Sequence, residues 1–215
     1  METAAPYVPE GASLTELATA IQACRGCALY QHASQAVFSR GPAHAPLVLI
    51  GEQPGDQEDR QGKPFVGPAG HVLVRALGEA GITPQDAYVT NVVKHFKFEQ
   101  RGPRRIHKTP QRTEIVACRP WLVAELAQVR PRVLVALGAT AAGALLGPDF
   151  RVTRQRGVLM PWPASSHEPG DFSPHPAQIL ATIHPSAVLR ADDQETAYRG
   201  LVKDLRIVAG ALGLA

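Results

Sequence analysis

Four short apolar runs recur along the chain, and segments with helical periodicity separate them. The runs lie at residues 47–50, 87–93, 133–137 and 178–182. The helical segments lie at residues 70–80, 113–129 and 139–146, and a last helix is expected at residues 194–212. Strands that alternate with helices form parallel sheets that helices cover on both faces. The pattern therefore predicts a three-layer α/β/α fold around a central four-stranded parallel sheet.

The start of the chain predicts a short flexible segment before a single domain. Residues 1–12 contain two prolines and a glycine, whereas Ser13 and Glu16 have the spacing of a helix capping box. We therefore expect a flexible start at residues 1–12 and one domain at residues 13–215, with a surface loop rich in Pro, Ser and His at residues 161–176. Neither a signal peptide nor a membrane-spanning run is evident, so a cytoplasmic protein is expected.

Residues 51–70 follow the first apolar run directly and have the composition of a ligand-binding loop. They begin Gly-Glu-Gln-Pro-Gly-Asp and end Gly-Lys-Pro-Phe-Val-Gly-Pro-Ala-Gly. Glycines let the backbone approach a ligand closely, and prolines stiffen the loop. An ordinary turn needs only about two to six residues and no cluster of carboxylates and amides.

Polar segments also follow the second and fourth runs, at residues 94–112 and 184–190. Because parallel strands end at the same edge of a sheet, these segments and residues 51–70 are expected to form one site there. His184 is held by Pro185 at this edge, where a stiffly held donor could stabilise negative charge on a leaving group. The alternative is a histidine that only caps a loop.

The segment at residues 94–112 is rich in positive charge. Its cations are Lys94, Lys97, Arg101, Arg104, Arg105, Lys108 and Arg112. They suit a polyanion, although a solvated basic loop is the alternative. The cations around His107 favour the neutral imidazole, which is the nucleophilic form. The alternative for His107 is an exposed histidine on a binding loop.

Three cysteines and one histidine form a candidate metal site. Cys24 and Cys27 make a CxxC pair, Cys118 lies far along the chain, and His95 follows the second run. Three thiolates and an imidazole could hold zinc or an iron–sulfur cluster. Buried free thiols and a redox CxxC pair are the alternatives.

Taken together, five motifs resemble the uracil-DNA glycosylase superfamily, most closely its iron–sulfur branch, family 4. The motifs lie at residues 51–55, 64–70, 88–94, 137–139 and 184–186. Two departures from family 4 resemble the UdgX group, which cross-links itself to uracil-containing DNA. His95 stands where a cysteine is expected, and the loop at residues 101–110 is longer than in family 4.

The resemblance implies a fold, a cofactor and a substrate. The fold is the uracil-DNA glycosylase fold, and the cofactor is a 4Fe-4S cluster on Cys24, Cys27, His95 and Cys118. The partner is uracil-containing DNA, either single-stranded or with the uracil flipped out of the duplex. A monomer that does not bind membranes is expected.

The resemblance also implies roles for individual residues. Phe65 would stack on uracil, Asn91 would read its amide edge, and His184 would donate to uracil O2 and stabilise the departing anion. Three further residues are expected to contact the substrate or order the loop around it: Gln53, Asp56 and Ser186. Arg105 and Lys108 would brace the loop against phosphates.

By the same resemblance, His107 would attack C1′ of the abasic sugar and stay attached to it. Glu52 would accept the proton or stabilise the sugar cation. The alternatives are a hydrolytic glycosylase that releases free abasic DNA and a non-catalytic DNA-binding module with structural zinc. A small-molecule nucleotide enzyme is disfavoured because no GxGxxG or Walker loop follows a strand.

Overall fold

The computed structural model describes residues 2–162 and 178–214. Its central sheet has the strand order β2-β1-β5-β7-β6. The strands are β1 (Leu47–Gly51), β2 (Ala87–Asn91), β5 (Val133–Leu137), β6 (Leu159–Pro161) and β7 (Gln178–Thr182). The four strands β2, β1, β5 and β7 pair in parallel with their neighbours. This confirms the four-stranded parallel sheet and the α/β fold class.

The sheet differs from the prediction by a fifth strand. β6 pairs antiparallel with β7 at the edge of the sheet. It has only three residues and ends in proline, so it lacks the alternation by which a strand is recognised in a sequence. The predicted surface loop at residues 161–176 lies almost entirely outside the described residues.

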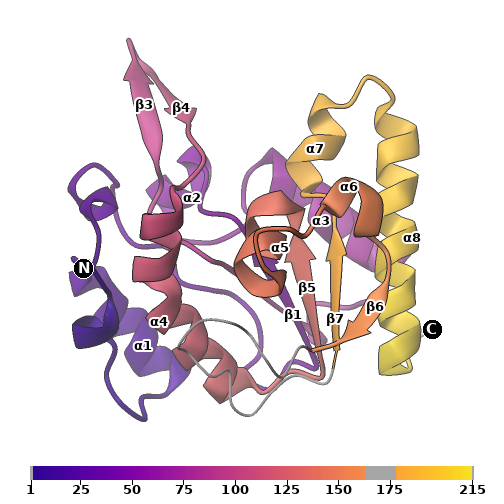
Figure 1. Ribbon diagram of the computed structural model, residues 1–215, viewed down its shortest axis with the longest axis horizontal. Helices are drawn as coiled ribbons and strands as arrows, with labels where there is room; N and C mark the ends of the chain where they lie inside the picture. Colours follow the sequence, from indigo (N-terminus) through magenta and orange to yellow (C-terminus); the bar gives the residue numbers. More distant parts are fainter. Residues whose placement is uncertain (1, 163–177, 215) are drawn as a thin grey trace.

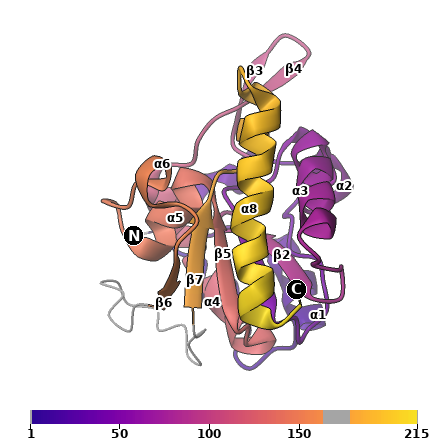
Figure 2. The ribbon, with the colours of Figure 1, turned by 90° about the vertical axis from the view of Figure 1, so that its right-hand side faces the viewer.

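Helices cover both faces of the sheet, as predicted (Figures 1 and 2). Alternate residues of each strand point to opposite faces, so Val48 and Ile50 join one core and Leu47 and Leu49 the other. The first core packs α1 (Leu14–Ala20), α4 (Arg112–Val129) and α5 (Gly138–Leu146). The second packs α3 (Pro68–Glu79), α7 (Pro185–Arg190) and α8 (Gln194–Leu212). The short helices α2 (Asp56–Gln61) and α6 (Val152–Gln155) lie in the connecting loops.

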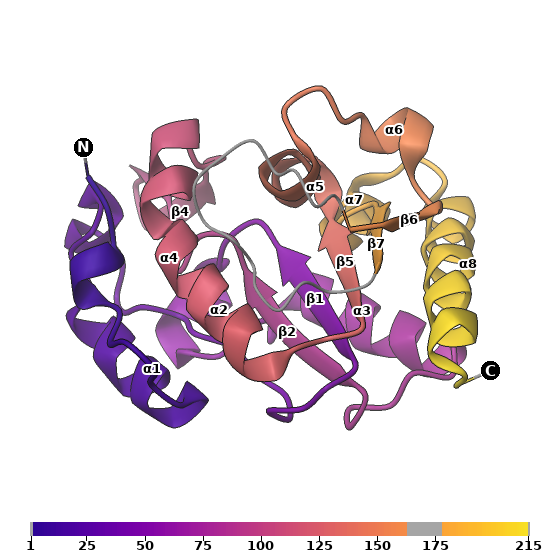
Figure 3. The same ribbon diagram turned by 60° about the horizontal axis from the view of Figure 1, so that its bottom comes forward.

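The N-terminal segment contacts the body of the protein. Ala4 is buried, and its N–H donates to the carbonyl of Ala117 at 2.8 Å. Short 3-10 helices follow at Ala5–Tyr7, Ile21–Ala23 and Ala28–Gln31. Figure 3 shows α1 beside α4 at one end of the molecule, with α8 at the other. Within the described part of the chain, none of the helices has the length and apolarity that crossing a membrane requires.

The basic segment forms a hairpin that projects from the body (Figure 1). Its strands, β3 (Phe98–Arg101) and β4 (Arg104–His107), pair antiparallel in a separate two-stranded sheet. The hairpin leaves the end of the sheet where β1, β2, β5 and β7 terminate, so it carries His107 to that edge.

Candidate active site

A cavity of about 880 Å³ lies at the carboxyl ends of the four parallel strands. The cavity is lined by loop residues that follow β1, β5 and β7, by the end of β2 and by the hairpin. Its lining includes Glu52, Gln53, Glu58, Phe65, Asn91, His107, Thr140, His184, Ser186 and Arg190. The three polar segments therefore meet at one site.

Phe65 and Asn91 form one wall of the cavity, and Gly51 lets them come together. A Cβ on Gly51 would lie 2.4 Å from Oδ1 of Asn91 and 2.8 Å from Cζ of Phe65. The Phe65 ring stacks beside the His184 ring, with centroids 6.2 Å apart. A planar ring with an amide and an imidazole at its edge can bind a planar heterocycle by stacking and hydrogen bonding.

Glu58 holds the two halves of the loop at residues 51–70 together. This buried carboxylate accepts hydrogen bonds from the backbone N–H of Gly55 at 3.2 Å and of Gly67 at 2.8 Å. We did not single out Glu58 in the sequence. Its position three residues after a glycine N-cap is the only local signal, since it is that of the glutamate in a capping box.

The hydrogen bonds of His184 determine its tautomer. The backbone N–H of Ser186 donates to Nδ1 of His184 at 3.1 Å, so Nδ1 is unprotonated and the ring proton lies on Nε2. Burial, with a smaller contribution from the positive charge of Arg190, lowers the pKa of His184 to about 4. His184 is thus a neutral imidazole whose Nε2–H can donate.

His107 lines the cavity, and its Nε2 has two polar neighbours. Its Nε2 lies 2.9 Å from Nε2 of Gln53 and 3.5 Å from Oε1 of Glu52. The Gln53 amide is oriented by the Lys97 N–H, which donates to Gln53 Oε1 at 3.0 Å. Because an amide nitrogen can only donate, Nε2 of His107 can accept from it when the ring proton is on Nδ1. Partial burial lowers the pKa of His107, and the Glu52 carboxylate opposes this shift.

The side chain of Gln53 binds the base of the hairpin. Its amide nitrogen also faces the carbonyl oxygens of Lys97 at 3.1 Å and Lys108 at 3.0 Å. The side chain is buried at the base of the hairpin and has its polar atoms bound to the hairpin backbone. It therefore positions His107 from the end of β1.

Comparison with known proteins decides the family. Residues 38–206 match the model of the uracil DNA glycosylase superfamily. The chain belongs to this superfamily. The Type-4 uracil-DNA glycosylase of Archaeoglobus fulgidus is 38% identical over 202 residues, which cover 92% of this chain and 94% of that protein. Those of Thermotoga maritima and Pyrobaculum aerophilum are each 34% identical, covering 81% and 92% of this chain and 82% and 93% of their own lengths.

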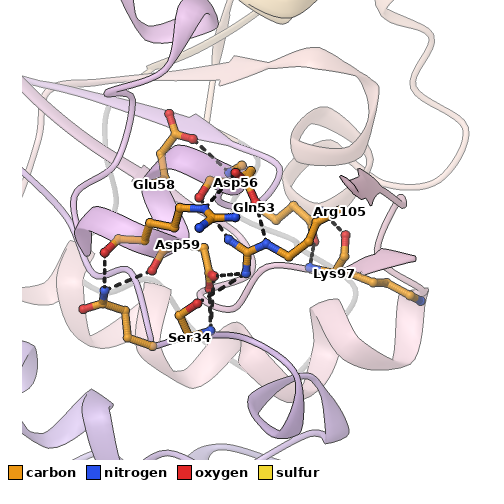
Figure 4. A network of polar contacts seen from close by, with 10 residues as sticks. Ser34, Gln53, Asp56, Glu58, Asp59, Lys97 and Arg105 are labelled. Carbon is orange, nitrogen blue, oxygen red and sulfur yellow. Dashed lines mark hydrogen bonds and ion pairs between the residues drawn. The ribbon is translucent and has the colours of Figure 1, made fainter. Parts of the chain in front are cut away.

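Within this uracil-DNA glycosylase fold, Arg105 binds two carboxylates of its own chain, and its contact with a phosphate stays a prediction. Its Nε lies 2.5 Å from Oδ1 of Asp56, and its Nη1 lies 2.6 Å from Oδ2 of Asp59 (Figure 4). The guanidinium also lies over the rings of Phe96 and Phe98, 5.4 and 5.0 Å from their centroids. Asp56, also expected to contact the substrate, is instead part of this arrangement, which we call the Arg105 clamp.

Other cations of the basic segment also have acidic partners. Lys94 is fully buried against Glu125, and Lys97 lies 2.9 Å from Glu114. Lys108 lies 2.5 Å from Glu99 at the surface of the hairpin and not in the cavity. Glu114 and Glu125 belong to α4, outside the segment, whereas Glu99 is the one acid within it.

The three cysteines are buried, and two of their sulfurs accept a hydrogen bond from an N–H group. The indole N–H of Trp121 donates to Cys24 Sγ at 3.2 Å, and the backbone N–H of Lys94 donates to Cys118 Sγ at 3.3 Å. His95 is also buried. Among residues 2–162 and 178–214, no group of three or more His, Cys, Asp or Glu side chains is close enough to hold a single metal ion.

Proposed function

We propose that this protein excises uracil from DNA and then holds the abasic sugar covalently through His107. Excision is supported by the superfamily match and by relatives named Type-4 uracil-DNA glycosylases. Capture is supported by one observation above all. Nε2 of His107, a residue that lines the cavity, lies 3.5 Å from the Glu52 carboxylate.

Uracil would enter the cavity only from single-stranded DNA or after flipping out of a duplex. We infer that Phe65 stacks on its ring and that the Asn91 amide pairs with its edge. The Nε2–H of His184 would donate to uracil O2 as negative charge develops there during cleavage of the N1–C1′ bond. A neutral donor fixed by Ser186 is suited to this, because it needs no reorganisation during the reaction.

Glu52 is assigned an electrostatic role. When the N1–C1′ bond breaks, uracil leaves with the electron pair and the sugar becomes an oxocarbenium ion. Oε1 of Glu52 lies on the side of the His107 ring that carries the attacking nitrogen. In the tautomer whose Nε2 can attack, the ring proton is on Nδ1, at the opposite side of the ring, so stabilisation of the sugar cation fits this geometry better than proton abstraction.

His107 would then form the bond that water forms in a hydrolase. Its Nε2 lone pair attacks C1′, which gives an imidazolium, and the Nδ1 proton leaves to solvent. A nucleophile held beside the reacting carbon has a large effective concentration relative to water. The product is an N-substituted imidazole without an easy hydrolytic exit, so each molecule would act once.

We also propose a structural 4Fe-4S cluster at Cys24, Cys27 and Cys118, with His95 as the fourth ligand. Buried thiols with N–H donors to sulfur suit such a cluster, whose ligands stand farther apart than those of a single ion. When bound, it would join the N-terminal segment, the segment after β2 and α4.

A denaturing gel tests the capture of DNA. Wild-type protein mixed with uracil-containing single-stranded DNA is expected to give a shifted band that survives SDS and heat. His107→Ala is expected to release uracil without the shifted band, because water can replace the imidazole. An unchanged adduct in His107→Ala would exclude His107 as the nucleophile.

A hydrolytic glycosylase that releases free abasic DNA is the second candidate. One observation favours it, because the His107 side chain is 48% exposed and water can reach the site. In that case the wild type would release uracil and the gel would show only abasic strands.

A further inference from the structure

Thr140 is a polar residue of the cavity to which the mechanism above gives no role. It lies in the first turn of α5, which begins directly after β5, the strand between β1 and β7. Its hydroxyl donates a hydrogen bond to Oε2 of Glu52, which follows β1. A side chain from the end of one strand thus reaches the carboxylate at the end of the next.

The start of α5 is fixed on its other side by His184. Gly138 has a φ of +89°, and a Cβ on it would lie 2.9 Å from Cβ of His184. A side chain at this position would push the start of α5 away from β7. The close approach at Gly138 therefore also determines where the Thr140 hydroxyl lies.

The two carboxylate oxygens of Glu52 have different partners. Oε2 accepts from Thr140, and Oε1 faces Nε2 of His107 at 3.5 Å. The side chain is only 20% exposed, so few water molecules can take the place of Thr140. A glutamate with one oxygen held cannot rotate its carboxylate freely, so its other oxygen stays directed toward Nε2 of His107.

We infer that Thr140 is a positioning residue that orients Glu52 toward the sugar cation. This inference rests on the proposed function, because it assigns Thr140 to the step in which Glu52 stabilises charge. Stabilisation of this kind depends on groups that are oriented before the reaction begins. Thr140 itself would contact neither uracil nor the sugar.

The test compares Thr140→Val, which keeps the shape of the side chain, with Thr140→Ser, which keeps the hydroxyl. Single-turnover uracil release and adduct formation are measured on uracil-containing single-stranded DNA, together with the dissociation constant. Thr140→Val is expected to slow both reactions roughly tenfold without weakening DNA binding, since one hydrogen bond to a charged group is lost. Thr140→Ser is expected to restore the rates. Thr196→Val, at an exposed helix position in α8, is the matched control and should react as wild type.

A double-variant cycle separates positioning from general damage to the fold. If Thr140 acts through Glu52, Thr140→Val has no further effect on rates in a Glu52→Ala background. An equal slowing in that background overturns the inference and leaves the proposed function intact. Should Thr140→Val fail to fold, Thr140→Ala enters the same cycle. If the wild type releases uracil without forming an adduct, the proposed capture by His107 is overturned. The inference about Thr140 is still tested in that case, because the cycle can be measured on uracil release.

Discussion

Arg190 is a cation at the mouth of the cavity that acts on both histidines. It lies at the end of α7 and lines the cavity. Its positive charge lowers the pKa of His184 and of His107, in each case after the larger effect of burial. A residue that binds neither histidine therefore helps to keep both rings neutral.

Arg190→Gln is expected to shift the acid limb of adduct formation to higher pH. Removal of a nearby positive charge makes protonation easier, so the pKa of His107 rises. At a given acidic pH a smaller fraction of the imidazole is then neutral and able to attack. The measurement is the rate of adduct formation between about pH 5 and 8, the range in which histidines titrate.

Arg154→Gln is the control, because Arg154 is exposed on α6 and its charge is not among those that shift the pKa of either histidine. It should leave the acid limb in place. An acid limb that stays unchanged in Arg190→Gln would show that this charge does not reach His107.

At the scale of elements, the β3–β4 hairpin depends on long-range ion pairs more than on buried apolar surface. Its strands have few buried side chains, yet the Arg105 side chain is only 10% exposed and reaches Asp59, which is fully buried. Ser34 joins the same group through its N–H, which donates to Asp59 at 2.9 Å. The Arg105 clamp thereby fixes β4 on α2 and places His107 at the cavity.

Arg105→Gln is expected to lower the ratio of adduct to free abasic DNA roughly tenfold while uracil release continues. The reason is that the attack depends on how well the imidazole is oriented, whereas Phe65 and His184 lie outside the hairpin. Arg105→Lys should give a ratio between those of wild type and Arg105→Gln, because lysine keeps the positive charge but cannot make the two-point contact of the guanidinium. The ratio is read from denaturing gels.

Arg101→Gln serves as the control for this prediction, since Arg101 is an exposed hairpin cation paired with Glu99. Its ratio of adduct to abasic DNA should equal that of wild type. A wild-type ratio in Arg105→Gln as well would mean that the clamp does not position His107.

These elements also show which parts of the structure could be predicted from the sequence. The four parallel strands are buried apolar runs, so local composition was sufficient to find them and to bring their three following segments to one edge. The clamp was not predictable, because Asp56 and Arg105 are 49 residues apart and nothing local pairs them. The side-chain contacts of Gln53 were not predictable either, since its partners Lys97 and Lys108 lie 44 and 55 residues away in the chain.

At the scale of the whole molecule, a buried ion pair joins the sheet to α4. Lys94, just after β2, and Glu125 of α4 are both fully buried and in contact. Glu125 also accepts hydrogen bonds from Tyr88 at 2.9 Å and from Thr90 at 3.0 Å, both on β2. These bonds satisfy charges that apolar side chains surround, and they fix α4, which carries Cys118, against the edge of the sheet.

Lys94→Met is expected to lower the free energy of unfolding by about 3–5 kcal/mol, because it leaves the Glu125 carboxylate buried without its cation. The double variant Lys94→Met/Glu125→Gln should recover most of this loss, since the amide can still accept from Tyr88 and Thr90 and carries no charge. Urea denaturation measures both values.

The matched control is Arg199→Met, which removes the cation of an exposed pair with Glu195 and should leave the free energy of unfolding nearly unchanged. If the double variant were as unstable as Lys94→Met, the uncompensated charge would not be the cause. The loss would then come from the packing of the Lys94 side chain, whose ammonium lies 5.7 Å from the centre of the Phe38 ring.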